Sequence, residues 1–286
     1  LLGLAGRIRR EVHVPVVCSL QDEDTWVNAM PEPWPAQIWA AMAERARDVD
    51  LFLPVSRTYG TAMADHLHLA PERWRVVPPG IDTASRQPAA PPTGPVIGYY
   101  ARLSAELGLG DLARAFFALR RRPEFRDVRL KAAGGRTADD QAFLRRLRQC
   151  VQAEHAEGAV TVTETFVPGD ADQFMQGVSV LSVPVPGGEA FGLFALEALA
   201  RAVPVVLPDV GAFAEVAAAT GGVLLYPPAG PDALADALAR VLTDEALRRR
   251  LASAGRAGVR RHFDVAAGTV PALLAAYKAA GVPGLP

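Results

Sequence analysis

The sequence predicts an α/β protein of parallel sheets covered by helices, and three observations support that fold class. From about Val96 onward, short apolar runs alternate with longer segments that carry apolar residues at helical spacing. The short runs are continuous stretches of Val and Leu, which are typical of strands buried on both faces. Strands that alternate regularly with helices imply a parallel sheet with helical crossovers, so we expect a Rossmann-like domain here.

The elements of this region follow in order along the chain. Strands are expected at residues 96–100, 128–133, 160–163, 178–185, 204–207 and 222–226. Helices are expected at residues 108–122, 138–155, 170–176, 191–202, 213–219 and 231–243. A further helix is expected at about 269–280.

The N-terminal part carries fewer units of the same kind. We expect strands at 14–18, 51–54 and 75–77, and helices at 35–47 and from the N-cap Ser56 to Leu67. Two or three strands are too few for an independent doubly wound domain. Because the chain also begins with Leu1 rather than Met, we expect the beginning of this domain to be missing. The segment 85–95 has a linker composition rich in Pro, Ala and Thr, so the predicted parts are 1–84, 85–268 and 269–286.

Composition limits the binding partners and the cellular compartment that we expect. Lys and Arg number 30 against 31 Asp and Glu, so no nucleic-acid partner is expected. The Arg-rich stretches at 120–122, 145–148 and 248–250 are interpreted as solvated helix faces, with a peripheral contact to anionic lipid as the less favoured alternative. The two cysteines, Cys18 and Cys150, show no pairing pattern, which favours a cytoplasmic protein. No apolar run reaches the length of a membrane-spanning helix.

The most informative stretch runs from residue 183 to 226. A strand ends there at a Gly-rich turn, and a helix is expected to begin near Phe191. The first amides of such a helix form an anion site, and Gly192 lets a ligand approach the backbone closely. Glu189 precedes the helix and Glu197 lies two turns into it, about 12 Å further along by helical rise. That separation suits one extended ligand with hydroxyls at both ends, such as a nucleotide sugar.

This stretch resembles the Glu-x7-Glu motif of the retaining glycosyltransferases of family 4, whose fold is the two-domain GT-B fold. The resemblance extends over most of the chain. It includes the segments 51–56 and 76–82, the segment 98–103 with Arg102, the residues Asp209 to Gly211 and Glu215, and the segment 221–225. The resemblance implies a partial acceptor-side domain at 1–84, a donor-binding domain at 85–268, and a last helix at 269–286 that returns to the first domain.

The implied activity is the transfer of a hexose-like sugar from a nucleoside diphosphate, UDP or GDP, to a hydroxyl acceptor with retention of configuration. The acceptor would be a glycan, a lipid-linked molecule or a small molecule, and no cofactor or essential metal is implied. By the same resemblance, Glu197 would bind the donor ribose, Glu189 would face the transferred sugar, and Arg102 would pair with the diphosphate. The other implied donor-binding positions are Gly188, the amides of Phe191, Gly192 and Leu193, and the backbone near Phe166 and Val167, which would flank the base.

Two positions depart from the family pattern. Leu107 stands where the family usually has a phosphate-binding lysine, and Gln21 stands where it commonly presents a histidine to the donor sugar. One charge-assisted hydrogen bond lost at a leaving diphosphate corresponds to about a 10- to 100-fold loss in rate. The alternative is therefore a weakened or inactive sugar-nucleotide or glycan-binding module derived from such an enzyme. We also expect the 286 residues alone to bind donor weakly and to transfer nothing.

Other candidate sites are less favoured. His66 and His68 lie on different sides of a helix and lack acidic or cysteine partners at ligand spacing, so no metal site is expected. Trp26, Trp34 and Trp39 flank a Pro-rich turn, where core packing is favoured over an acceptor groove. A third alternative, a Rossmann protein for an unrelated nucleotide, lacks the Gly-x-Gly-x-x-Gly fingerprint after a strand.

Overall fold

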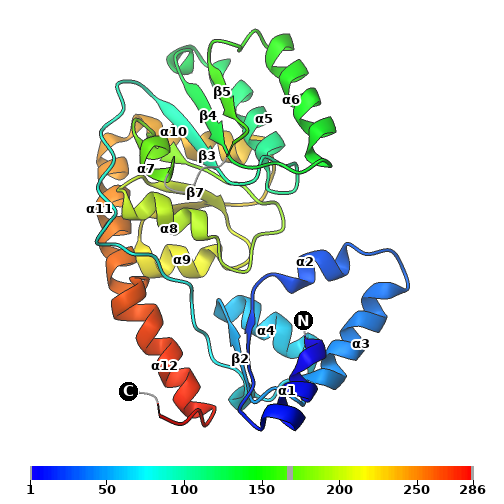
Figure 1. Ribbon diagram of the computed structural model, residues 1–286. Coiled ribbons are helices and arrows are strands. Elements are labelled where there is room, and N and C mark those ends of the chain that lie inside the picture. The colour runs from blue at the N-terminus through cyan, green and yellow to red at the C-terminus, as the bar shows by residue number, and fades with distance from the viewer. Residues whose placement is uncertain (1, 166–169, 285–286) are drawn as a thin grey trace. The chain divides into compact units, whose positions relative to one another are not determined.

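The computed structural model describes residues 2–165 and 170–284, and its contacts divide the chain into two compact units (Figure 1). The first unit comprises Leu1–Gly80, Glu189–Phe191 and Phe263–Pro286. The second comprises Ile81–Gly188 and Gly192–His262. Phe166 and Val167, which the resemblance places beside the base, lie outside the described residues.

The first unit is built around a small parallel sheet. Its strands are β1 (Val17–Leu20) and β2 (Leu51–Pro54), and its helices are α1 (Ala5–Val12), α2 (Glu23–Asn28), α3 (Trp34–Ala46), α4 (Arg57–Leu67) and α12 (Val270–Ala279). Helix α4 begins where predicted, because the Ser56 hydroxyl accepts a hydrogen bond from the Tyr59 N–H at 3.1 Å. The core forms where Ala276 of α12 packs against Leu51 and Leu53 of β2.

The predicted strand at 75–77 is wrong. The preceding residue, Trp74, forms only an isolated bridge to Phe52, although the Arg75 and Val77 amides still donate to carbonyls of the β2 strand. The ladder cannot continue because Pro78 and Pro79 have no N–H to donate. Helices α1 and α2 were not predicted, and α2 begins inside the acidic run that follows β1.

The second unit contains a six-stranded parallel sheet. Its strands are β3 (Val96–Tyr100), β4 (Arg129–Ala133), β5 (Val160–Thr163), β6 (Val180–Leu181), β7 (Val205–Pro208) and β8 (Val223–Tyr226), and their spatial order is β5-β4-β3-β6-β7-β8. The chain starts at the centre with β3, builds outward to β5, returns to β6 beside β3, and builds outward again to β8. The direction of construction therefore reverses between β3 and β6. In open α/β sheets, ligands bind beyond the carboxyl ends of the strands at such a switch point.

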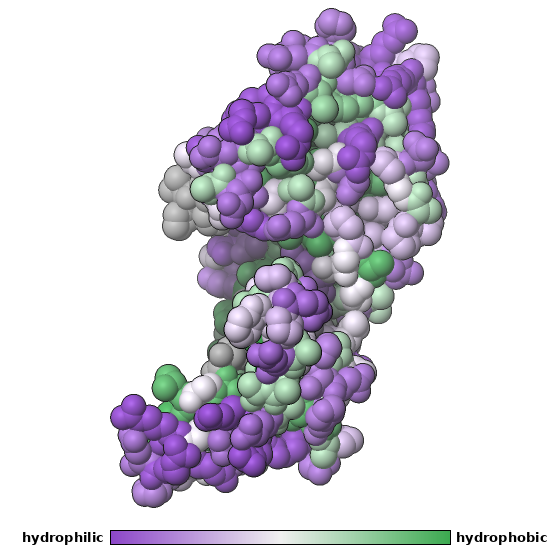
Figure 2. Space-filling view, turned by 90° about the vertical axis from the view of Figure 1, so that its right-hand side faces the viewer, coloured by the Kyte–Doolittle hydropathy of each residue, from purple (hydrophilic) through white to green (hydrophobic). Residues whose placement is uncertain are grey.

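Helices cover both faces of this sheet (Figure 1). They are α5 (Leu109–Arg120), α6 (Asp140–Ala153), α7 (Asp170–Met175), α8 (Leu193–Ala200), α9 (Phe213–Thr220), α10 (Pro231–Thr243) and α11 (Glu245–His262). Helix α10 packs on α5, whereas α11 packs on α8 and α9. The arginines of α6 at 145, 146 and 148 are exposed, as predicted for a solvated helix face, and the side of the molecule in Figure 2 is largely hydrophilic.

Two predicted boundaries near the switch point are wrong. Strand β6 spans only Val180–Leu181 instead of 178–185, and Pro184 and Pro186 cannot donate to a ladder beyond it. Helix α8 begins at Leu193 instead of Phe191, because Gly192 takes a left-handed conformation with φ of 89° and interrupts the helix there. Glu197 consequently lies one turn into the helix rather than two.

Candidate functional site

A pocket of about 310 Å³ lies at the switch point of the second unit. Its walls come from the segment after β3, from the start of α7, from α8 and from the linker. The lining residues are Arg86, Tyr100, Ala101, Arg102, Ala171, Asp172, Leu193, Phe194, Glu197 and Arg201. Three of the predicted donor-site residues, Arg102, Leu193 and Glu197, therefore line one cavity.

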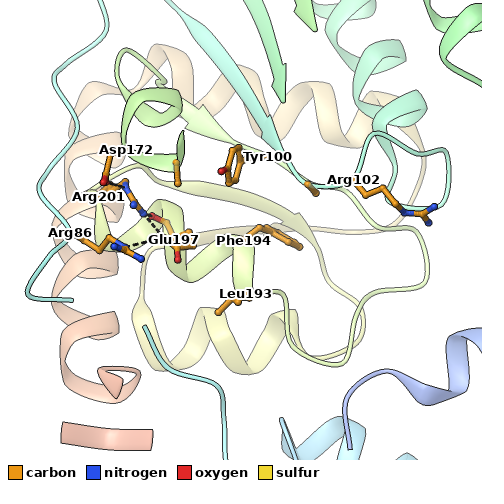
Figure 3. A pocket seen from close by; sticks show the side chains of 10 residues that line it. Arg86, Tyr100, Arg102, Asp172, Leu193, Phe194, Glu197 and Arg201 are labelled. Atoms are coloured by element: carbon orange, nitrogen blue, oxygen red, sulfur yellow. Dashed lines mark hydrogen bonds and ion pairs between the residues drawn. The ribbon is translucent and has the colours of Figure 1, made fainter. Parts of the chain in front are cut away.

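One end of the pocket holds a cluster of charged side chains around Glu197 (Figure 3). Its Oε2 atom accepts hydrogen bonds from Arg201 Nη1 at 2.5 Å and from Arg86 Nε at 3.3 Å. Arg201 Nε also donates to Asp172 at 2.6 Å. The Glu197 side chain is 19% exposed, so its carboxylate is held in a defined position while part of it still faces the cavity.

Arg102 occupies the opposite end of the pocket. Figure 3 shows its guanidinium directed away from the Glu197 cluster, with Tyr100 and Phe194 between them. One side of the guanidinium contacts both oxygens of Asp140 at 3.3 and 3.4 Å, and the other contacts Glu106. Burial would raise the pKa of Asp140, but hydrogen bonds from Thr137 and the charge of Arg102 outweigh burial and lower it. The ionised form of Asp140 is therefore favoured beside Arg102.

Between these ends, the N-terminus of α8 opens into the cavity. Leu193 and Phe194 line the pocket, and within the described part of the chain no side chain caps this helix. The first amides of a helix lack intrahelical partners and favour a negative charge in front of them. The turn before α8 directs these amides into the pocket because Gly192 adopts a left-handed conformation. A Cβ at this position would also lie only 2.8 Å from the Phe213 ring. The centre of the pocket can therefore receive an anionic group.

Tyr100 connects this pocket with a smaller one of about 250 Å³. The ring of Tyr100 lies 4.9 Å from that of Phe174 in α7, and burial raises the pKa of its hydroxyl. Lys131 of β4 also lines the smaller pocket and donates to the Phe174 carbonyl at 2.8 Å. Together the two pockets form an aromatic and polar surface along the carboxyl ends of β3 and β4.

The remaining predicted catalytic residues belong to the first unit. Burial, and secondly the charge of Asp22, raise the pKa of Glu189 to about 7. The pKa of Asp22 is itself raised, chiefly by burial. Gln21 is exposed directly after β1, where its backbone N–H donates to Glu23 at 2.8 Å. Glu189 is thus a carboxyl that changes protonation near neutral pH.

The other predicted positions fall in several environments. Phe191 is 7% exposed and packs edge-on against Phe263 with ring centres 5.5 Å apart, so its side chain serves the core of the first unit. Gly188 takes a left-handed conformation, φ 75°, in the turn before Glu189. His66 stacks on Trp39 at 4.1 Å. Across residues 2–165 and 170–284, no group of three His, Cys, Asp or Glu could hold a metal, and no helix has the length and hydropathy to span a membrane.

Most of the cluster at Glu197 was not predicted from the sequence. Arg201 follows Glu197 by four residues, so the spacing of facing side chains on a helix could have identified it. Arg86 and Asp172 approach from segments 111 and 25 residues away from Glu197 in the chain, and no local signal links them to it.

Two family models match the chain. The model described as Glycosyltransferase Family 4 matches residues 1–85, and the model described as Glycosyl transferases group 1 matches residues 80–258. Among curated proteins, D-inositol 3-phosphate glycosyltransferase of Acidothermus cellulolyticus is 30% identical over 298 residues, covering 97% of this chain and 65% of the relative. Phosphatidyl-myo-inositol mannosyltransferase of Mycobacterium leprae is 43% identical over 89 residues, covering 31% of this chain and 24% of the relative. The chain thus spans between a quarter and just under two thirds of these relatives.

Solved structures share the fold. Anabaena HepE in complex with UDP has a TM-score of 0.84 at 20% identity, covering 97% of this chain and 76% of that one. Sucrose-phosphate synthase from Thermosynechococcus elongatus has a TM-score of 0.79 at 22% identity, covering 93% of this chain and 68% of that one. The predicted α/β fold of the GT-B type is confirmed by this likeness.

Proposed function

Because the chain belongs to the glycosyl transferases group 1 family, we propose that it moves a hexose-like sugar from a nucleoside diphosphate to a hydroxyl acceptor, with retention of anomeric configuration. The observation that carries the proposal is the order of groups along one pocket: a half-buried carboxylate, then open helix amides, then an arginine. A nucleoside diphosphate presents ribose hydroxyls and then phosphates in the same order.

The donor would bind as an extended molecule in the second unit. Glu197 would accept hydrogen bonds from the ribose hydroxyls, and the amides of Leu193 and Phe194 would meet the phosphates. Arg102 would hold the diphosphate at its outer end, since a planar guanidinium can bind two phosphate oxygens at once. The base would lie towards Tyr100 and the smaller pocket. In this arrangement, residues 85–268 form the donor-binding domain.

In the proposed reaction, the bond between the anomeric carbon and the diphosphate oxygen breaks while the acceptor oxygen bonds to the same face of the carbon. Negative charge grows on the leaving diphosphate, and one of its oxygens accepts the proton that the acceptor hydroxyl loses. Arg102 and the α8 amides would stabilise that charge, and such preorganised electrostatics are commonly the largest catalytic contribution. We propose that these groups act without a metal ion. Glu189 and Gln21 are proposed to face the transferred sugar, and residues 1–84 to contribute to the acceptor side.

Relatives suggest the chemistry of the first ligands to test. HepE was solved with UDP and with UDP-glucose, so uridine diphosphate is the first donor probe. The names of the curated relatives contain phosphatidyl-myo-inositol and D-inositol 3-phosphate, so we propose a polyol, glycan or lipid-linked hydroxyl as acceptor.

Calorimetric titration with UDP and GDP tests the donor site. We expect binding of one of them, weakened about 10- to 100-fold by Arg102→Met, because one charge-assisted contact to phosphate is lost. Arg126→Met is the matched control, since Arg126 is exposed and does not line the pocket. Absence of nucleotide binding, or equal affinities for the two variants, would contradict the proposed site.

The alternative of a non-catalytic binding module has one specific observation in its favour. Leu107, in the loop before α5, supplies no charge where family members usually place a lysine. Release of UDP or GDP from a sugar donor in the presence of acceptors distinguishes the two functions. Tight nucleotide binding without any product across glycan, lipid-linked and polyol acceptors would favour the module.

A further inference from the structure

Arg201 is the largest of the fully buried side chains and the only charged one among them in the described part of the chain, with a side-chain exposure of 2%. Removing a guanidinium from water is unfavourable unless its N–H groups are paired. Arg201 meets that requirement with Asp172 Oδ1 at 2.6 Å and with two atoms of Glu197, the carbonyl at 2.8 Å and the carboxylate Oε2 at 2.5 Å. A buried cation has therefore been placed directly against a carboxylate that lines the pocket.

A purely structural role explains part of this arrangement. Arg201 follows the last residue of α8, and a cation at a helix C-terminus is favourable. Its bond to Asp172 also ties α7 to α8, and its carbonyl accepts from the Ala89 N–H of the linker at 2.8 Å. None of these contacts requires the Glu197 carboxylate.

The contacts of Glu197 are unequally divided between its two oxygens. Oε2 accepts from both Arg201 and Arg86, whereas Oε1 accepts from no residue in the described part of the chain. Arg86 is 28% exposed and lies 3.3 Å away, so it holds the carboxylate less firmly than the buried Arg201. Figure 3 shows both guanidinium groups approaching the carboxylate from the same end of the pocket. One oxygen is thus fixed, and the other is left for a ligand.

We propose that Arg201 is a positioning residue that fixes the Glu197 carboxylate so that its free oxygen distinguishes ligands that carry ribose hydroxyls from ligands that lack them. The inference rests on the proposed function, because it assigns that oxygen to the ribose of a nucleoside diphosphate. Without Arg201, the carboxylate rotates freely or turns towards Arg86, and a bound hydroxyl no longer meets an oriented acceptor. Preorganisation of this kind strengthens the contact by removing the entropy that binding would otherwise lose.

The test compares the affinity for a ligand that carries the ribose hydroxyls with the affinity for a ligand that lacks them. Calorimetry gives the dissociation constants of UDP and 2′,3′-dideoxy-UDP, and their ratio measures recognition of the ribose hydroxyls. For the wild-type chain we expect a ratio of about 10 or more, as for a hydrogen bond to a charged acceptor. In Arg201→Met the ratio is expected to fall to about 3 or less, and Arg201→Lys is expected to restore part of it.

Arg256→Met is the matched control. Arg256 of α11 donates to the Ala200 carbonyl at 3.1 Å, so it binds the same end of α8 without touching Glu197. Its loss should leave the ratio unchanged, whereas a role in merely holding α8 would give both variants the same effect. Circular dichroism and thermal melting establish that each variant is folded.

Each possible result tests either this inference or the proposed function. A folded Arg201→Met variant that retains the wild-type ratio overturns the inference, and so does a wild-type chain that binds UDP with a ratio near 1. If Arg201→Met does not fold, Arg201→Gln replaces it, because a neutral amide removes the ion pair with Glu197 but keeps a donor for Asp172. A wild-type ratio in that folded variant would overturn the inference. A wild-type chain that binds neither UDP nor GDP refutes the proposed function itself.

Discussion

Glu189 offers a quantitative prediction, because its burial should make the first unit less stable as pH rises. Burial and the nearby charge of Asp22 raise its pKa from the usual 4.5 to about 7. Below pH 4.5 the carboxyl is protonated in both folded and unfolded chains, so no free energy is lost. As pH rises towards 7, the unfolded chain ionises more readily than the folded one. The shift corresponds to a loss of about 3 kcal/mol in the free energy of unfolding, most of it between pH 5 and 8.

The measurement is urea unfolding of the wild-type chain and Glu189→Gln at pH 5, 6, 7 and 8. All four tryptophans of the chain lie within Leu1–Gly80, so their fluorescence reports on the first unit. The neutral glutamine keeps the shape and removes the titration. We therefore expect the two proteins to be similar in stability at pH 5, and the variant to be more stable at pH 8 by about 2 kcal/mol.

Two further variants isolate the cause. Asp22→Asn removes the second contribution to the raised pKa and should reduce the difference without abolishing it, since burial is the larger contribution. Glu72→Gln is the matched control, because it removes a charge from the exposed surface of the same unit. A difference between wild type and Glu189→Gln that is the same at pH 5 and pH 8 would show that Glu189 does not titrate near neutral pH in the folded chain.

Three other substitutions test a glycine turn, a helix cap and the predicted phosphate site. Gly108→Ala should destabilise the second unit by about 3 kcal/mol in urea unfolding followed by circular dichroism. Gly108 has φ of 79°, and a Cβ there would lie 2.0 Å from the Pro184 carbonyl oxygen. A change near zero would contradict this geometry. Ser56→Ala should cost about 1 kcal/mol in tryptophan-detected unfolding, because the N–H of Tyr59 loses its cap; unchanged stability would mean that water replaces the hydroxyl. Leu107→Lys should raise affinity for UDP by about 10-fold in calorimetry, whereas Leu107→Met should not, and equal effects would remove Leu107 from the phosphate site.

The parts of the fold that the sequence predicted best are those determined by local pattern. The strand at Val96–Tyr100 was predicted residue for residue, because five consecutive residues are buried there and the run ends before polar residues. The strand β6 was overestimated because apolar residues continue to Val185, although prolines prevent pairing. Apolar composition thus reports burial, whereas hydrogen-bonding capacity decides where a strand ends.

The candidate site shows a similar division. Glu197 was identified from its position beside a Gly-rich turn and Arg102 from the family resemblance, and both line the pocket. The charged partners that orient them were missed, because Arg86 and Asp140 reach them from segments more than 30 residues distant. Local sequence identifies residues that offer chemistry, whereas tertiary packing decides which of their atoms remain available.

The two ends of the pocket are constructed on one physical plan. At each end, a charged side chain contacts a buried partner of opposite charge on one side: Asp140, 7% exposed, beneath Arg102, and Arg201 behind Glu197. The other contact of Arg102 is Glu106, which is 77% exposed and four residues away, and exposed pairs of this kind contribute little. In the proposed function, a diphosphate would replace Glu106 at small cost while Asp140 keeps the guanidinium in place. At each end, the buried partner fixes the position of the charged group. Arg102 remains able to bind a ligand because its contact with Glu106 is weak, and Glu197 because one of its oxygens is free.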